Sequence, residues 1–257
     1  MITLTTDFGL EDPYVAQMKG VILSINADSN LIDISHSVKK FDVRMGAFTL
    51  ASAAPYFPKG TVHLAVVDPG VGTKRRSVMV QTKQAFFVGP DNGILMLAAK
   101  SQGIEHVYDL SNSPYRLPKI SSTFHGRDIF APAAAYLDQG VKPFEFGPEI
   151  IDPLTPKFAE TTRKNTSLYG EVLHIDSFGN IVTNIAEKDI SNVKTVKVKL
   201  AECSLEATFA KTYGEVNLKD PIALVGSHGF LEFALNQGNA AEKYNVHSGD
   251  LVTITLS

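Results

Sequence analysis

The stretch Thr61-Val62-His63-Leu64-Ala65-Val66-Val67-Asp68-Pro69-Gly70-Val71-Gly72 joins a strand signal to the turn that follows it. A short apolar run bounded by turn residues is typical of a strand that is buried in a sheet. The N-terminal stretch Ile2-Thr3-Leu4-Thr5-Thr6-Asp7-Phe8-Gly9 repeats the order of strand, acid and glycine. These two stretches predict strands of an open α/β sheet, each with an acid at its carboxyl end.

Strand and helix signals alternate outward from this stretch, through the first 150 residues. Pro13 suits the first turn of a helix, and apolar residues then recur at helical spacing. We expect helices over Val15–Ile25, Val43–Tyr56, Ile94–Lys100 and Arg127–Leu137. We expect strands over Ile2–Thr6, Leu31–Ile34, Thr61–Val67 and His106–Leu110, and a hairpin over Ser77–Thr82 and Ala85–Val88. This alternation predicts an α/β domain over residues 1–150 with a largely parallel sheet.

The character of the chain changes after residue 150. Residues 151–166 contain Pro153 and Pro156 and show no sustained periodicity, which predicts a linker. Short β-rich runs follow at Tyr169–Ile175, Ile181–Ile185, Val193–Leu200, Ser204–Phe209, Ile222–Val225, Phe230–Leu235 and Leu251–Leu256. They predict a smaller all-β domain over residues 167–257, built as an antiparallel barrel or sandwich.

Composition narrows the class of protein. The 257 residues are 44% hydrophobic and 20% charged, with a net charge of -3. A nucleic-acid surface needs a concentrated basic field, so no nucleic-acid partner is expected. The single cysteine, Cys203, excludes an internal disulfide and favours a reducing cytoplasm. The chain starts directly on a strand-like run and its apolar runs are short, so neither a secretory signal nor a membrane span is expected.

Two acids and one histidine are the candidate site residues. In an open parallel sheet, ligands bind at the carboxyl ends of strands, where Asp7 and Asp68 precede glycine turns. An acid at such a point often holds a ribose diol, although both acids could instead only cap their turns. His125 precedes a predicted helix, near its free amides, and both a catalytic and a structural role stay open.

Three other patterns lack the residues that their chemistry needs. The loop Gly70–Gly72 lacks the third glycine of a dinucleotide fingerprint and the Gly-Lys-Ser/Thr of a P-loop. The run Gly226–Gly229 contains a serine but has no glycine two residues before it, as a nucleophile elbow requires. His36, His63 and Asp33 lack the spacing of a metal-binding motif, so no metal site is expected.

Short motifs occur together along the whole chain. They are Thr6-Asp7-Phe8-Gly9, Val15-Ala16-Gln17-Met18-Lys19-Gly20, Val67-Asp68-Pro69-Gly70-Val71-Gly72, Gly89-Pro90-Asp91-Asn92-Gly93, Thr123-Phe124-His125-Gly126-Arg127-Asp128, Ile175-Asp176-Ser177-Phe178-Gly179-Asn180, Thr183-Asn184-Ile185 and Asn236-Gln237-Gly238-Asn239-Ala240. In this order they resemble the S-adenosyl-L-methionine hydroxide adenosyltransferase family, whose relatives include the fluorinase and the chlorinase. The resemblance implies a homotrimer of two-domain chains with sites at the subunit interfaces.

The resemblance also implies a catalytic set. Asp68, Arg75 and His125 would activate water, and halogenating relatives lack these three residues. Those relatives also carry an inserted loop, whereas Val78–Val88 here passes through a tight turn at Lys83-Gln84. These two features place the chain with the hydrolases of the family.

A substrate-binding set follows from the same resemblance. Its members are Asp7 for the ribose hydroxyls, Asp12, Asp176 and Ser227 for the methionine end, Phe178, Asn180 and Phe209 for the adenosine, the backbone around Gln237 for the adenine edge, and Phe41. His228, after Ser227, departs from the family pattern, in which a smaller residue or an arginine is expected.

The implied reaction is the hydrolysis of S-adenosyl-L-methionine to adenosine and L-methionine, without a metal or redox cofactor. The sulfonium already makes the thioether a good leaving group, so the missing element is a water held in line with the C5′–S bond. Such orientation can be worth about 7–11 kcal/mol. Asp68 or His125 takes the proton, and the sequence leaves both open. The alternatives are a non-catalytic sensor of S-adenosyl-methionine or adenosine, and halide transfer to a 5′-halo-adenosine.

Overall fold

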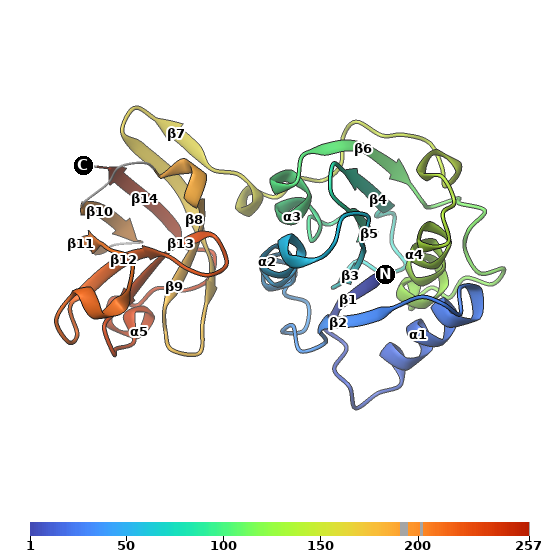
Figure 1. Cartoon of the computed structure of the whole chain (residues 1–257), viewed down its shortest axis with the longest axis horizontal. Coiled ribbons are helices and arrows are strands. Elements are labelled where there is room, and N and C mark those ends of the chain that lie inside the picture. Colours follow the sequence, from blue (N-terminus) through green and yellow to red (C-terminus); the bar gives the residue numbers. More distant parts are fainter. Residues whose placement is uncertain (191–194, 201–202, 257) are drawn as a thin grey trace. The chain divides into compact units, whose positions relative to one another are not determined.

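The two halves of the chain pack around separate cores in the computed structural model, which describes residues 1–190, 195–200 and 203–256. The division falls between Pro156 and Lys157. The segment 151–166, expected as a linker, contains the single-turn helix η4 (Lys157–Ala159) and the strand β7 (Thr162–Lys164). Figure 1 labels the elements along the chain, from blue at the N-terminus to red at the C-terminus.

A six-stranded sheet forms the centre of the N-terminal unit, in the order β2-β1-β3-β5-β4-β6 (Figure 1). Its strands are β1 (Ile2–Thr6), β2 (Leu31–Ser35), β3 (Val62–Val66), β4 (Ser77–Thr82), β5 (Phe86–Pro90) and β6 (Ile104–Asp109). The pairs β1–β2, β1–β3 and β3–β5 are parallel, whereas β4 runs antiparallel to β5 and β6. The sheet is therefore mixed, and the expectation of a largely parallel sheet is not confirmed. The reason is the predicted hairpin itself, because a tight turn joins only antiparallel neighbours.

Helices cover both faces of this sheet, with α1 and α4 packed together on one face and α2 and α3 on the other (Figure 1). They are α1 (Tyr14–Ile25), α2 (Val43–Ala53), α3 (Met96–Ser101) and α4 (Ala131–Asp138), with the short helices η1 (Ala54–Tyr56), η2 (Gly126–Phe130) and η3 (Pro143–Glu145). Helix α1 buries Val15, Met18 and Ile22, which recur at helical spacing. Asp42 caps α2 by accepting a hydrogen bond from the Met45 amide over 2.9 Å.

Strands β1 and β3 are buried along their whole length, because helices cover both faces of the sheet. His63 of β3 is fully buried. Its Nδ1 lies 2.7 Å from the Thr3 hydroxyl, and its ring stacks on Phe87 with 4.9 Å between the ring centroids. Burial lowers the pKa of His63 to about 4, so the ring is neutral at pH 7.

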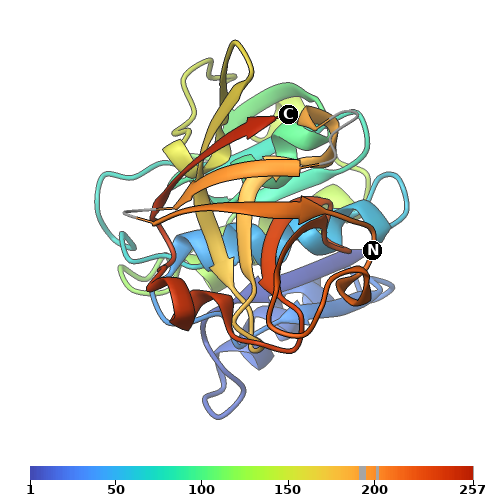
Figure 2. The same cartoon turned by 90° about the vertical axis from the view of Figure 1, so that its left-hand side faces the viewer.

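The C-terminal unit is a closed seven-stranded barrel, whose strands face the viewer in Figure 2. The order β14-β10-β11-β12-β13-β9-β8 closes because β14 also pairs with β8, and β7 adds to β8. The strands are β8 (Ser167–Ile175), β9 (Ile181–Ala186), β10 (Thr195–Leu200), β11 (Cys203–Phe209), β12 (Pro221–Val225), β13 (Phe230–Leu235) and β14 (Leu251–Leu256), and the short helices are η5 (Glu187–Asp189), η6 (Tyr213–Glu215) and α5 (Ala240–Tyr244).

The barrel agrees with the expected small β domain in outline and departs from it in two details. Strands β11 and β12 run parallel, because the long connection through η6 brings the chain back in the same direction. The short helix α5 is an addition to the expected all-β content. The predicted strand over Val193–Leu200 is observed from Thr195 onward, and residues 193 and 194 lie outside the described residues. No helix in the described part of the chain has the length and apolar character needed to cross a membrane.

Candidate active site

Asp7 and Asp68 lie at the same edge of the N-terminal sheet. Strands β1 and β3 are parallel neighbours, with Thr6 opposite Val66 at their carboxyl ends. Asp7 follows Thr6 directly, and Asp68 comes two residues after Val66. Ligands of open α/β sheets bind at this edge, so the position of both acids suits a binding site.

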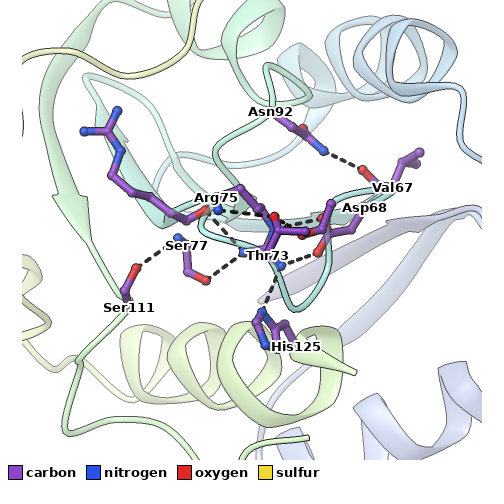
Figure 3. A network of polar contacts seen from close by, with 10 residues as sticks. Val67, Asp68, Thr73, Arg75, Ser77, Asn92, Ser111 and His125 are labelled. Carbon is purple, nitrogen blue, oxygen red and sulfur yellow. Dashed lines mark hydrogen bonds and ion pairs between the residues drawn. The ribbon is translucent and has the colours of Figure 1, made fainter. Parts of the chain in front are cut away.

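Asp68, Arg75 and His125 form one hydrogen-bonded cluster at this edge (Figure 3). Arg75 binds the carboxylate of Asp68 through two nitrogens: Nε donates to Oδ1 over 2.8 Å, and Nη2 donates to Oδ2. The same Nη2 donates to Nδ1 of His125 over 2.9 Å. Only 10% of the Arg75 side chain and 6% of the Asp68 side chain are exposed. A paired charge that is shielded from water holds its geometry firmly, so the cluster is preorganised.

The contact with Arg75 determines where the proton of His125 lies. A guanidinium only donates hydrogen bonds, so Nδ1 of His125 is the acceptor and the ring proton is on Nε2. Burial, and then the positive charge of Arg75, lower the pKa of His125 below its ordinary 6.5, against smaller opposing effects of Asp68 and Asp128. The ring is therefore neutral at pH 7. The ring therefore offers an N–H donor at Nε2, and its unprotonated nitrogen, Nδ1, is occupied by Arg75 and is not available as a base.

Two contacts fix the loop that carries Asp68. Gly72 has a φ of +75°, and a Cβ at this position would lie 2.3 Å from the carbonyl oxygen of Ser122. Only glycine allows this approach, which packs the loop against the segment just before His125. On the other side, the Asn92 side chain donates to the carbonyl of Val67 over 2.8 Å, directly before Asp68 (Figure 3).

His125 is held by an unusual helix start. The residues after it, Gly126–Phe130, form a π-turn, a feature often found at functional sites. The fully buried Asp128 lies inside this turn and accepts hydrogen bonds from the Ser121 amide, over 2.7 Å, and from Arg127. These bonds tie the loop before His125 to the helix after it.

Asp7 and Phe41 are also brought together. Oδ2 of the buried Asp7 accepts a hydrogen bond from the Phe41 amide over 2.8 Å. Phe41 has a φ of +66°, a strained conformation for a bulky residue, and 69% of it is exposed. Strain of this kind is found at ligand sites, and here it presents an aromatic ring to solvent. Asp12 lies exposed in the loop between β1 and α1.

A pocket of about 740 Å³ opens in the C-terminal unit, and its wall comes from three connections. The turn after β8 contributes Asp176, Phe178 and Asn180, helix η6 contributes Tyr213, and the turn after β13 contributes Gln237. Four of the residues singled out from the sequence therefore line one cavity. We refer to it below as the C-terminal pocket.

Asp176 shapes the turn that it occupies. Its Oδ1 accepts hydrogen bonds from the amides of Phe178, over 2.9 Å, and Asn180, over 2.8 Å. Its Oδ2 accepts from the side-chain nitrogen of Asn180 over 2.9 Å. The turn leaves Phe178 76% exposed, so its aromatic side chain is available for a planar ligand.

The residues that line the pocket overlap only in part with the residues singled out from the sequence. Phe209 and Ser227 are not among the residues that line it, and Phe209 packs as a half-buried residue against the barrel core. Tyr213 lines the pocket and was missed. The available signal was weak: one aromatic residue in a polar loop, between Thr212 and Glu215, which cap each other.

The groups gathered at these places are carboxylates, one guanidinium, a neutral imidazole and aromatic rings. Within the described residues, no group of three or more histidine, cysteine or acidic side chains is placed to hold a metal ion. The cluster of Asp68, Arg75 and His125 can orient a small polar molecule such as water. The C-terminal pocket can hold a flat, partly polar ring.

Comparison with known proteins assigns the class. The model of the SAM hydroxide adenosyltransferase N-terminal domain matches residues 2–147, and the model of the C-terminal domain of the same proteins matches residues 170–253. The chain therefore belongs to the SAM hydroxide adenosyltransferase family, where SAM is S-adenosyl-L-methionine.

The chain is similar over nearly its full length to proteins named (R)-S-adenosyl-L-methionine hydrolase. The one from Methanocaldococcus jannaschii is 38% identical over 99% of this chain and 95% of its own length. The one from Thermus thermophilus is 38% identical over 95% of each chain. A crystal structure of an uncharacterized conserved protein from Thermotoga maritima matches with a TM-score of 0.86 and 37% identity, covering 99% of this chain and all of the other. Proteins named fluorinase are more distant, for example one from Actinoplanes sp. at 29% identity over 99% of this chain.

Proposed function

We propose that this protein hydrolyses S-adenosyl-L-methionine to adenosine and L-methionine, by attack of a water on the ribose C5′ carbon. The observation that carries the proposal is the hydrogen-bonded cluster of Asp68, Arg75 and His125 at the ligand-binding edge of the sheet. The full-length similarity to S-adenosyl-L-methionine hydrolases supports the same reaction.

The reaction needs little acid–base power from the protein. The water oxygen forms a bond to C5′ while the C5′–S bond breaks, and the bonding electron pair goes to sulfur, which leaves as a neutral thioether. The water becomes strongly acidic as its new bond forms, so a weak base is sufficient to take its proton.

We infer a role for each member of the cluster from its hydrogen bonds. Nε2–H of His125 donates to the water oxygen and holds it in line with the C5′–S bond, because Nδ1 is occupied by Arg75. Asp68 takes the proton, since His125 cannot accept one at Nε2 in this protonation state. Arg75 fixes both partners in their relative positions.

The substrate-binding roles follow the chemistry of the remaining groups. Asp7 holds the ribose hydroxyls, with the strained Phe41 beside it. Phe178 and Tyr213 provide aromatic walls for the adenine, and the turn at Gln237 meets its polar edge. Asp12, Asp176 and Ser227 remain candidates for the methionine end, and Phe209 for the adenosine.

A direct assay tests the proposed reaction. Purified protein is incubated with S-adenosyl-L-methionine without added metal, and products are separated by chromatography. We expect adenosine and methionine in equal amounts, and in ¹⁸O-labelled water we expect the label in the 5′-hydroxyl of adenosine. Tight binding without product would favour a sensor, and label elsewhere would exclude attack at C5′.

Halide competition separates hydrolysis from the chemistry of the fluorinase relatives. The cluster is polar and charged, whereas a halide nucleophile needs a site that strips its water shell. Addition of fluoride or chloride is therefore expected to leave the rate of adenosine release unchanged. A 5′-halo-adenosine formed at a rate comparable to that of hydrolysis would place the chain in the halogenating branch.

Assembly as a homotrimer is part of the proposal, on the strength of the family resemblance. The cluster belongs to the N-terminal unit and the adenosine pocket to the C-terminal unit, and one substrate must reach both. If neighbouring chains supply the two halves, trimers reassembled from equal amounts of His125→Ala and Asp176→Ala chains should regain about a quarter of the wild-type sites. No regain after mixing, or full activity of a monomer, would show that one chain supplies both halves.

The single cysteine, Cys203, suits a cytoplasmic location.

A further inference from the structure

A buried carboxylate lies behind the C-terminal pocket. Glu232 of β13 is only 4% exposed, and it points away from the barrel interior that Leu231 and Phe233 help to fill. The Tyr213 hydroxyl donates to Oε1 of Glu232 over 2.6 Å. Burial and this bond raise the pKa of Tyr213, so its hydroxyl keeps its proton. Glu232 is thus linked directly to one wall of the pocket.

His228 is the second donor to the same carboxylate. Its Nδ1 accepts a hydrogen bond from the Phe230 amide over 3.2 Å, which places the ring proton on Nε2. Nε2 then donates to Oε2 of Glu232 over 3.2 Å. One O–H donor, from Tyr213, and one N–H donor, from His228, therefore converge on the same carboxylate, and each of its two oxygens accepts one hydrogen bond. An amide at position 232 would have a single oxygen and would leave one donor without an acceptor.

Gly226 makes room for this arrangement. A Cβ at position 226 would lie 2.4 Å from Nε2 of His228 and 2.9 Å from Oε2 of Glu232. The run Gly226–Gly229 is no nucleophile elbow, and its first glycine is explained by this contact. The same contact accounts for His228, whose ring fills the space beside Glu232.

Keeping a carboxylate buried is costly, and an apolar side chain at such a place is often neutral or stabilising. The presence of a buried carboxylate at position 232 therefore calls for a role other than stability. Tyr213 begins a single-turn helix and is 40% exposed, so burial alone does not hold its ring in one position. A charge-assisted hydrogen bond from its hydroxyl fixes the ring.

We propose that Glu232 is a positioning residue of the C-terminal pocket, which holds the Tyr213 ring as one wall and the Ser227-His228 turn in place, so that the adenosyl group binds in one orientation. The inference rests on the proposed function, in which this pocket takes the adenosine portion of the substrate. Glu232 contacts the pocket wall and the turn beside it, and not the reacting atoms, which the proposed function places at the cluster of Asp68, Arg75 and His125, so we expect its main effect on binding.

The test compares Glu232→Gln, Tyr213→Phe and the double variant in the full-length protein. We expect each single variant to raise the KM for S-adenosyl-L-methionine and the Kd for adenosine about tenfold, with kcat within about twofold of the wild type. The losses in the double variant should be smaller than the sum of the two single losses, because Tyr213→Phe removes one of the two donors that compete for the single oxygen left by Glu232→Gln. Glu206→Gln, at an exposed position of β11, is the matched control and should change neither constant.

Three outcomes overturn the inference: unchanged KM and Kd in Glu232→Gln, additive losses in the double variant, or a fall in kcat at unchanged KM. Far-ultraviolet circular dichroism excludes unfolding as the cause of a loss. Calorimetric titration with adenosine does not depend on turnover. If the wild type binds adenosine but releases no methionine, the proposed reaction fails while the role of Glu232 is still decided.

Discussion

The Asp68–Arg75–His125 cluster and the C-terminal pocket are built on opposite principles. The cluster is small and shielded, and its three side chains fix one another through hydrogen bonds. The pocket is roomy, and Phe178 in its wall is largely exposed. Its Tyr213 wall is fixed from behind, by a buried residue that does not line it.

Under the proposed function, this difference separates two tasks. A preorganised polar cluster contributes to the transition state, where small displacements are expensive. An aromatic pocket holds substrate and transition state equally, so it determines affinity more than rate. Substitutions in the two regions should therefore change different kinetic constants.

The largest expected effect is at the cluster. Asp68→Ala and His125→Ala should each lower kcat by about 100-fold or more, while the Kd for S-adenosyl-L-methionine stays within about threefold. Steady-state kinetics and calorimetric titration measure the two constants, with His106→Ala, an exposed histidine, as control. Full activity of His125→Ala would remove the cluster from the mechanism.

Low pH should destabilise the N-terminal unit more than the C-terminal unit. His63 has a pKa of about 4 in the folded state and 6.5 when exposed. Between pH 6.5 and pH 4 the unfolded chain therefore takes up a proton that the folded chain refuses, and the N-terminal unit loses about 3 kcal/mol of stability across this window. Above pH 6.5 the ring is neutral in both states and has no effect.

Hydrogen exchange measures the two units separately. Protection of the β1 and β3 amides, corrected for intrinsic exchange, should fall from pH 7 to pH 4.5 more than protection of the β13 amides. The difference should shrink in His63→Gln and persist in His106→Gln. Equal losses in both units would mean that His63 does not control acid sensitivity.

Asp7 should behave like a pocket residue although it belongs to the N-terminal unit. Asp7→Ala removes a charged acceptor for the ribose and is expected to raise KM about 20-fold with little change in kcat. Asp7→Asn keeps an oxygen for the Phe41 amide and separates this loop contact from the charge. A large fall in kcat in Asp7→Asn would assign Asp7 to the chemical step instead.

The smallest expected effect is at Phe178. Removal of its ring should raise the KM about fivefold, within the range of stacking energies of bases on aromatic side chains. Phe144→Ala, in which an equally prominent ring is removed from η3, is the matched control. Equal effects of the two substitutions would argue against a binding role for the Phe178 ring.

Local patterns in the sequence predict most elements of this fold, and the misses come from pairing between distant segments. The strand Ile2–Thr6 is marked by a short apolar run, and the helix that ends at Ile25 is marked by Pro13 and by apolar residues at helical spacing. These signals depend only on neighbours in the chain. The direction of β4 relative to β6 depends on which strands meet in space. A hairpin was expected at β4 and β5, but its effect on the sheet as a whole is not visible in either strand alone.

The site divides in the same way. Asp7 and Asp68 stand out because an acid after a buried strand is a local signal. The π-turn after His125 and the left-handed backbone of Phe41 carry no such signal, because they arise where segments pack together. Tyr213 is missed for a related reason: its proposed role depends on a hydrogen bond to Glu232, which follows it by 19 residues.

The geometry of the cluster depends on the absence of a side chain at Gly72. A single methyl group there would collide with the backbone at Ser122 and displace the segment that leads into His125, while every polar side chain of the cluster stayed unchanged. Under the proposed function, binding through the C-terminal pocket would survive such a change. One nucleotide substitution could thus convert a descendant of this enzyme into a receptor that holds its former substrate without consuming it.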